Sequence, residues 1–276
     1  MTRNSSFSIR NTDIWVSPAT LFTIGWLLTM ISIPIIGWVG KDYFDVGVIA
    51  GVLLQACTVL TILQQAWGTS MVVKLTGLVV VVTWLLEFVG SQTGLPFGRY
   101  HYTEALQPQL GGVPLLIPIA WLMMLPVSWA VAFAILQPGK WHNSSSADTL
   151  QPATGHLLRF AALAGLAMTV WDLFLDPQMT SWNYWVWEQP GGYFGIPWIN
   201  FVGWWISATL ITLLLMRLLQ PENLPVKPML VIYALVWALQ SIGQGFFWNQ
   251  PGPAIVGFIA MGTLLGCVAW RRLVYR

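Results

Sequence analysis

The sequence predicts an all-α fold: a polytopic integral membrane protein with about eight transmembrane helices. Of its 276 residues, 56% are hydrophobic and only 8% are charged, whereas a soluble domain usually carries about a quarter charged residues. A surface this poor in charge is suited to lipid, not water. The 18 tryptophans agree with this, because indole rings favour the interface between membrane and water.

Eight apolar segments are each long enough for a helix to cross about 30 Å of hydrocarbon. They cover residues 18–38, 45–64, 71–90, 113–136, 157–176, 196–218, 228–248 and 252–270. The first follows Arg3 and Arg10 and lacks a clear small-residue cleavage site, so we expect an uncleaved span and not a signal peptide. We expect a single transmembrane helical domain over residues 1–276.

Three of the segments between spans are long, namely 91–112, 137–156 and 177–195. The middle one is polar and serine-rich, which is typical of a plain linker. The other two are dense in glycine, proline and aromatic residues, which favours ordered loops. We expect the turn residues 93–98 to belong to a capping or re-entrant loop that folds over the outer ends of the spans.

The positive charges predict the orientation. With eight spans, ten of the twelve Lys and Arg residues fall on one side, and only Lys41 and Arg99 fall on the other. Cytoplasmic loops carry the excess of Lys and Arg. We therefore expect a multi-pass protein of the cell membrane with both termini cytoplasmic.

Three acidic residues lie inside predicted spans: Glu87, Asp172 and Asp176. A charge at the centre of a span costs roughly 2.5–3.5 kcal/mol, so such residues are candidates for function. All three lie near the outer ends of their spans, and the two aspartates, four residues apart, share one helical face. Asn200, Gln240 and Gln244 fall at a similar depth on other spans. The alternative is that these groups only solvate helix ends or bond between helices.

A layer of carboxyl groups away from water is suited to proton transfer. Crowded carboxyl groups in such a site resist ionisation. A neutral carboxylic acid serves as a general acid and an ionised neighbour as a general base. The sequence thus predicts proton chemistry beside an apolar substrate.

Missing motifs narrow the chemistry further. The three histidines are scattered, both cysteines lie in apolar segments, and no glycine-rich nucleotide loop occurs. No basic, aromatic-interleaved patch suggests nucleic acid. The spacing Asp172-x-x-x-Asp176 is faintly similar to the aspartate clusters of membrane prenyltransferases. Those enzymes need a second acidic cluster and cations for diphosphate, for which the outer side offers only Lys41 and Arg99. We expect no metal and no other cofactor.

Two stretches carry a more specific pattern. The first is 87–102 (EFVGSQTGLPFGRYHY), followed by 112–114 (GVP) and Trp121; the second joins 172–177 (DLFLDP), 185–187 (WVW), 193–197 (YFGIP) and 200–204 (NFVGW). Together they resemble the signatures of the CruF-type carotenoid 1,2-hydratases, closely over roughly residues 85–205. The resemblance implies addition of water to the terminal C1–C2 double bond of an acyclic carotenoid end. The implied substrates are γ-carotene, lycopene or C50 relatives.

The resemblance also implies roles for residues. Protonation at C2 gives a tertiary cation at C1, which water captures. Glu87 and the Asp172/Asp176 pair would transfer protons, with Asp176 expected to tune Asp172 or to cap its helix before Pro177. The substrate-binding candidates are Asn200, Arg99, Tyr100, Tyr102, Trp185, Trp187 and Trp204. The expected partners are the carotenoid, water and the lipid bilayer, with other carotenoid-pathway enzymes as candidate partners and no nucleic acid.

Two other interpretations stay open on the sequence alone. A carotenoid cyclase or isomerase would form the same cation without capturing water. A non-enzymatic transporter, or a carotenoid- or quinone-binding protein, would use the acids as a proton relay. Internal pseudo-symmetry would favour a transporter, and we find none in the sequence.

Overall fold

The computed structural model describes residues 17–137 and 154–274. This part of the chain forms eight long helices, each long and apolar enough to cross a membrane. They are α1 (Pro18–Ile36), α2 (Lys41–Trp67), α3 (Thr69–Thr93), α4 (Leu116–Leu136), α5 (Thr154–Ser181), α6 (Trp198–Leu219), α7 (Val226–Ile242) and α8 (Pro251–Val274). The all-α, eight-helix prediction is confirmed.

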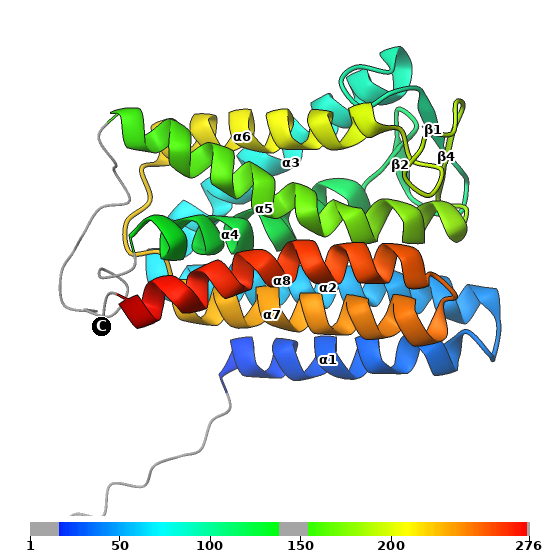
Figure 1. Cartoon of the computed structure of the whole chain (residues 1–276), viewed down its shortest axis with the longest axis horizontal. Coiled ribbons are helices and arrows are strands. Elements are labelled where there is room, and N and C mark those ends of the chain that lie inside the picture. Colours follow the sequence, from blue (N-terminus) through cyan, green and yellow to red (C-terminus); the bar gives the residue numbers. More distant parts are fainter. Residues whose placement is uncertain (1–16, 138–153, 275–276) are drawn as a thin grey trace, which may run out of the picture.

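The helices lie side by side in an antiparallel bundle (Figure 1). Helix α4 is central: it packs against α2, α3, α5, α7 and α8, and it is buried on nearly all sides from Trp121 to Ala134. Helix α1 lies at one edge and packs mainly on α2, so most of its surface is left for lipid. A helix that is apolar on all sides can lie at the centre of the bundle or at its lipid-facing edge, because hydrocarbon and the protein interior are similarly apolar surroundings.

The fifth span ends later than predicted, because its helix continues through a proline. We expected the fifth span to end at residue 176, yet α5 continues through Pro177 to Ser181. Pro177 has no N–H to donate to the carbonyl four residues earlier. The hydroxyl of Tyr193 donates to that Leu173 oxygen instead, at 2.9 Å. A partner from a distant loop thus replaces the missing helical bond.

Two other span ends also differ from their predicted form. The predicted span at 113–136 begins as a strand, and its helix starts only at Leu116. The seventh span changes at Gly243 into a short π-helix, η2 (Gly243–Phe247). π-helical turns inside helices are rare and are frequently found at functional sites.

The two aromatic loops are ordered, as predicted, and they meet. Strand β1 (Tyr100–Tyr102) of the first loop pairs antiparallel with β4 (Trp185–Trp187) of the second. A second small sheet joins β2 (Gln109–Leu110) to β3 (Val113–Pro114). Both sheets lie at the same end of the bundle, on the right in Figure 1. We call this the loop end.

The described cations divide between the two ends of the bundle. Lys41 begins α2 and Arg99 lies directly before β1, both at the loop end. The opposite end carries Lys74, Arg159, Arg217, Lys227, Arg271 and Arg272. Residues Arg3, Arg10, Lys140 and Arg276, the termini themselves and most of the predicted linker lie outside the described residues. The orientation across the membrane therefore stays a prediction.

Candidate active site

A cavity of about 60 Å³ lies at the loop end of the bundle. Its walls come from five helices, α2 to α6, and from the paired strands β1 and β4. Three of its lining residues carry carboxyl or amide groups: Glu87, Asp176 and Asn200. Most of the remaining wall is aromatic or aliphatic. We call this space the acid cavity.

The strand pairing explains why so many rings face the acid cavity. Side chains two residues apart on a strand point to the same face. Tyr100 pairs with Trp187 and Tyr102 with Trp185, and all four of these side chains line the cavity. His101, which lies between the two tyrosines, is on the other face and is exposed.

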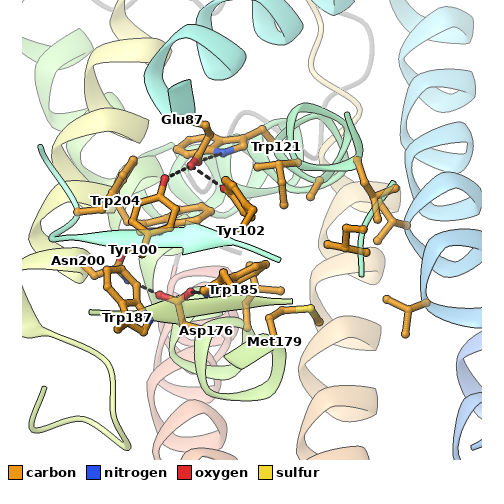
Figure 2. Close-up of a pocket in the computed structure, with 18 of the residues that line it drawn as sticks. Glu87, Tyr100, Tyr102, Trp121, Asp176, Met179, Trp185, Trp187, Asn200 and Trp204 are labelled. Carbon is orange, nitrogen blue, oxygen red and sulfur yellow. Dashed lines mark hydrogen bonds between the residues drawn. The ribbon is translucent and has the colours of Figure 1, made fainter. Parts of the chain in front are cut away.

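Glu87 is surrounded by hydrogen-bond donors. The hydroxyls of Tyr100 and Tyr102 donate to its Oε2 at 2.6 and 2.9 Å, and Nε1 of Trp121 donates to its Oε1 at 3.2 Å (Figure 2). The Glu87 side chain is 3% exposed. An ionised carboxylate is an acceptor only, and three convergent donors match that form.

The two tyrosines keep their protons. Burial raises the pKa of the Tyr100 and Tyr102 hydroxyls well above its usual value, and the nearby Glu87 carboxylate raises it further. Both side chains therefore remain O–H donors toward Glu87 over the whole physiological range of pH.

Asp172 and Asp176 form a second acidic group, one helical turn apart on α5. Both are buried, and Nδ2 of Asn200 donates to Oδ2 of each. The two Oδ2 atoms therefore meet at one amide nitrogen. Two carboxyl groups crowded in a buried site resist ionising together.

Asp176 is the member of this pair that reaches the acid cavity. Trp185 donates its Nε1 proton to Asp176 Oδ1 at 3.0 Å. Asp172 does not line the cavity, and its Oδ1 has no hydrogen-bond partner among residues 17–137 and 154–274. Figure 2 shows Glu87 and Asp176 on opposite sides of the cavity, with the rings of Tyr100 and Tyr102 between them.

Stacked tryptophans form another wall. The rings of Trp121 and Trp204 are parallel within 2°, with their centroids 4.5 Å apart. Trp171 meets Trp204 edge-on at 6.3 Å. The faces of such rings carry negative charge density and can stabilise a cation.

The structure brings together most of the residues that the sequence indicated. Glu87, Asp176 and Asn200 line one cavity, as do Tyr100, Tyr102, Trp185, Trp187 and Trp204. Arg99 is exposed and does not line it, so this residue has no place in the candidate site. Trp121 also lines the cavity. The sequence pattern contains this residue but predicts no role for it, although its place near the outer end of a span indicates one.

Gln240 of α7 and Gln244 of η2 do not join the acidic residues at the acid cavity. Gln244 is buried on the far side of α5, where its Nε2 donates to Phe174 O at 2.7 Å and to Gln178 Oε1 at 3.1 Å. Gln240 is also buried outside the acid cavity. Depth along a span placed these side chains correctly, but depth alone does not give the direction in which a helix face points.

Comparisons with known proteins agree on one family. The sequence model of a family described as "carotenoid biosynthesis protein" matches residues 46–266. A protein of Haloarcula japonica called bisanhydrobacterioruberin hydratase is 29% identical over 130 residues, which are 47% of this chain. The match spans only 39% of that relative's length. No solved structure matches the chain.

Proposed function

Because this chain belongs to the family of carotenoid biosynthesis proteins, we propose that it is a carotenoid 1,2-hydratase. Water adds across the terminal C1–C2 double bond of an acyclic end group and leaves a tertiary hydroxyl at C1. The substrates are lycopene, γ-carotene or a C50 relative. The observation that carries the proposal is a small, ring-lined cavity, with two aspartates that meet at one buried amide on one side and a donor-surrounded carboxyl group on the other.

The proton comes from the aspartate pair. Asp176 faces the cavity, and its carboxyl group and that of Asp172 are crowded at one buried amide, so the pair keeps a proton. Asp176 protonates C2 of the alkene, and the electron pair of the double bond forms the new C–H bond. C1 becomes a tertiary cation, and the Asn200 amide, which donates to both carboxyl groups, stabilises the charge left on Asp176.

The cation forms between negative groups and aromatic faces. Glu87 lies across the cavity as a carboxylate, and Trp121, Trp204 and the tyrosine rings form the wall around it. Fixed charges and π-faces in a site that excludes bulk water stabilise a developing cation strongly. These groups are in place before the reaction, so no reorganisation is needed.

Water then captures the cation. Its oxygen bonds to C1 and its proton passes to a carboxylate, for which Glu87 is the free base. The Nε1 proton of Trp187, a cavity residue, has no protein acceptor among the described residues and can hold the water. One proton leaves the aspartate pair and one reaches Glu87. Its return from Glu87 to Asp176 through water restores the site, so the net reaction uses only water.

Expression in three bacterial strains, which accumulate lycopene, γ-carotene or an acyclic C50 carotenoid, tests the proposal. The expected product is heavier than its substrate by one water and carries a tertiary hydroxyl, as seen by mass spectrometry and NMR. A strain with the Asp176→Asn variant, expressed at the same level, should keep the substrate unchanged. A new pigment of unchanged mass would instead indicate a cyclase or isomerase, and no new pigment in any of the three strains would contradict the proposal.

A further inference from the structure

A second cavity, of about 50 Å³, lies directly behind the acid cavity. It is enclosed by α1, α2, α4, α5 and α7. Five side chains line both spaces and form the partition between them: Val48, Val52, Met123, Leu175 and Met179. The partition is aliphatic, and its two methionines have flexible side chains that adapt easily to a passing molecule.

The lining of this second cavity contains polar atoms without partners. Nε1 of Trp26 and Oε1 of Gln240 have no hydrogen bond to any described residue. Both residues line the cavity, and they are 1% and 7% exposed. Gln55, also in the lining, has only the weakly accepting sulfur of Met124 as partner for its Nε2.

Unpaired donors and acceptors indicate what fills the space. Leaving a buried polar group unpaired costs about 1–3 kcal/mol, and such groups are usually satisfied by ordered water. A polyene chain cannot bond to an indole N–H or to an amide oxygen. A water molecule can do both, since it accepts from the first and donates to the second. About 10–15 Å³ of such space holds one water, so this cavity has room for a few.

We propose that the second cavity is a water-binding chamber that supplies the nucleophile to the acid cavity. Water is held by hydrogen bonds to Trp26 and Gln240, and it passes between Met123 and Met179 to the cation at C1. The inference rests on the proposed hydratase function. It explains how a site walled by aromatic and aliphatic side chains receives water at the moment when the cation forms.

The cation has two fates, and their ratio measures the water supply. Capture by water gives the alcohol. Loss of a proton from C2 gives back the alkene, and in D₂O this return leaves deuterium at C2. An enzyme that protonates normally but lacks positioned water will therefore exchange more and hydrate less. The ratio of exchange to hydration does not depend on how much of the protein is folded.

The experiment compares purified variants with lycopene in detergent and D₂O. Gln240→Leu and Trp26→Phe each remove one unpaired polar atom from the chamber. We expect each to raise the exchange-to-hydration ratio about fivefold, the effect of losing one hydrogen bond. Trp129→Phe is the matched control: its Nε1 donates to Thr212 at 2.9 Å, it lines neither cavity, and its ratio should equal that of the wild type.

The outcomes separate this inference from the function on which it rests. If the wild-type protein neither hydrates the carotenoid nor exchanges deuterium at C2, the proposed hydratase function itself is contradicted. A hydrating wild type whose ratio is unchanged in Gln240→Leu and Trp26→Phe would overturn the water chamber alone. A lower KM for lycopene with an unchanged ratio would assign the space to the polyene, because the apolar replacement then improves substrate binding.

Discussion

At the residue scale, one turn of α5 decides which of the two aspartates reaches the acid cavity. Asp176 lines the acid cavity, whereas Asp172 does not and bonds to Asn200. From the sequence we expect Asp172 to act and Asp176 to assist. On this geometry we propose the reverse assignment, in which Asp176 delivers the proton and Asp172 assists.

The carboxyl groups give the first prediction. Asp176→Asn and Glu87→Gln should each lower turnover by about 10²- to 10⁴-fold, the usual contribution of a general acid or base. The amides keep the shape of the side chains, so both variants should fold. The measurement is the rate of hydrated-carotenoid formation by purified protein. Asp42→Asn and Glu104→Gln, at exposed positions, are the matched controls and should be as active as the wild type.

The indole of Trp121 gives the second prediction. Trp121→Phe removes the donor to Glu87 Oε1 but keeps a ring against Trp204. Loss of one preorganised donor should lower kcat, by about 10²-fold at most since the two tyrosine donors remain, and leave KM nearly unchanged. Trp237→Phe, whose Nε1 donates to Phe258 O outside the acid cavity, is the control. A rise in KM at constant kcat would make Trp121 only a binding surface.

At the element scale, α5 determines the position of the acidic pair. Pro177 follows Asp176 directly and interrupts the helical bonding at Leu173, which Tyr193 restores from the second loop. The Tyr193 ring also packs against Phe201 of α6 at 5.0 Å. The loop therefore stabilises the helix, although Pro177 and Tyr193 are 16 positions apart in the sequence.

This arrangement gives the third prediction. Tyr193→Phe keeps the ring but leaves the Leu173 carbonyl unpaired, so it should destabilise the protein by about 1–3 kcal/mol. Thermal unfolding in detergent would measure the loss. In a Pro177→Ala background, residue 177 regains an N–H that can bond to Leu173. The same tyrosine change should then cost much less, and equal losses in both backgrounds would contradict this account.

At the scale of the whole molecule, most of the described cations and the acid cavity lie at opposite ends of the bundle. Six described cations lie at one end of the bundle, whereas the acid cavity and the paired loops lie at the other. The positive-inside rule then predicts that the cavity lies near the outer surface of the membrane. A carotenoid is about as long as the bilayer is thick, so its end group can reach this cavity while its polyene lies along the helices.

The orientation is the fourth prediction. In a protein with Cys57 and Cys267 replaced by serine, we introduce Gln189→Cys in the second loop or Asn223→Cys between α6 and α7. Both positions are exposed and lie at opposite ends of the bundle. A membrane-impermeant thiol reagent should label the first in intact cells and the second only after permeabilisation. The opposite pattern would reverse the topology and place the acid cavity on the cytoplasmic side.

The sequence by itself determined the number of spans, their order and the depth of the polar residues. Hydropathy suffices for this, because every span must cover the same thickness of hydrocarbon. It also indicated Glu87, Asp176, Asn200 and the loop aromatics, since polar and aromatic residues at one depth on several spans tend to meet. Its errors at the span ends, such as α5 beyond Pro177, arise because a distant Tyr193 supplies the missing bond.

Only the tertiary structure decided which of these residues share a cavity. Depth along a helix is a property of the sequence, but the face that a helix turns toward its neighbours depends on how all the helices pack. That packing turned Asp176 and not Asp172 into the cavity and left Arg99 exposed outside it. It also placed Gln240 in a second cavity behind the first. The pairing of β1 with β4, between residues about 85 apart, is a non-local contact of the same kind, and it closes the site.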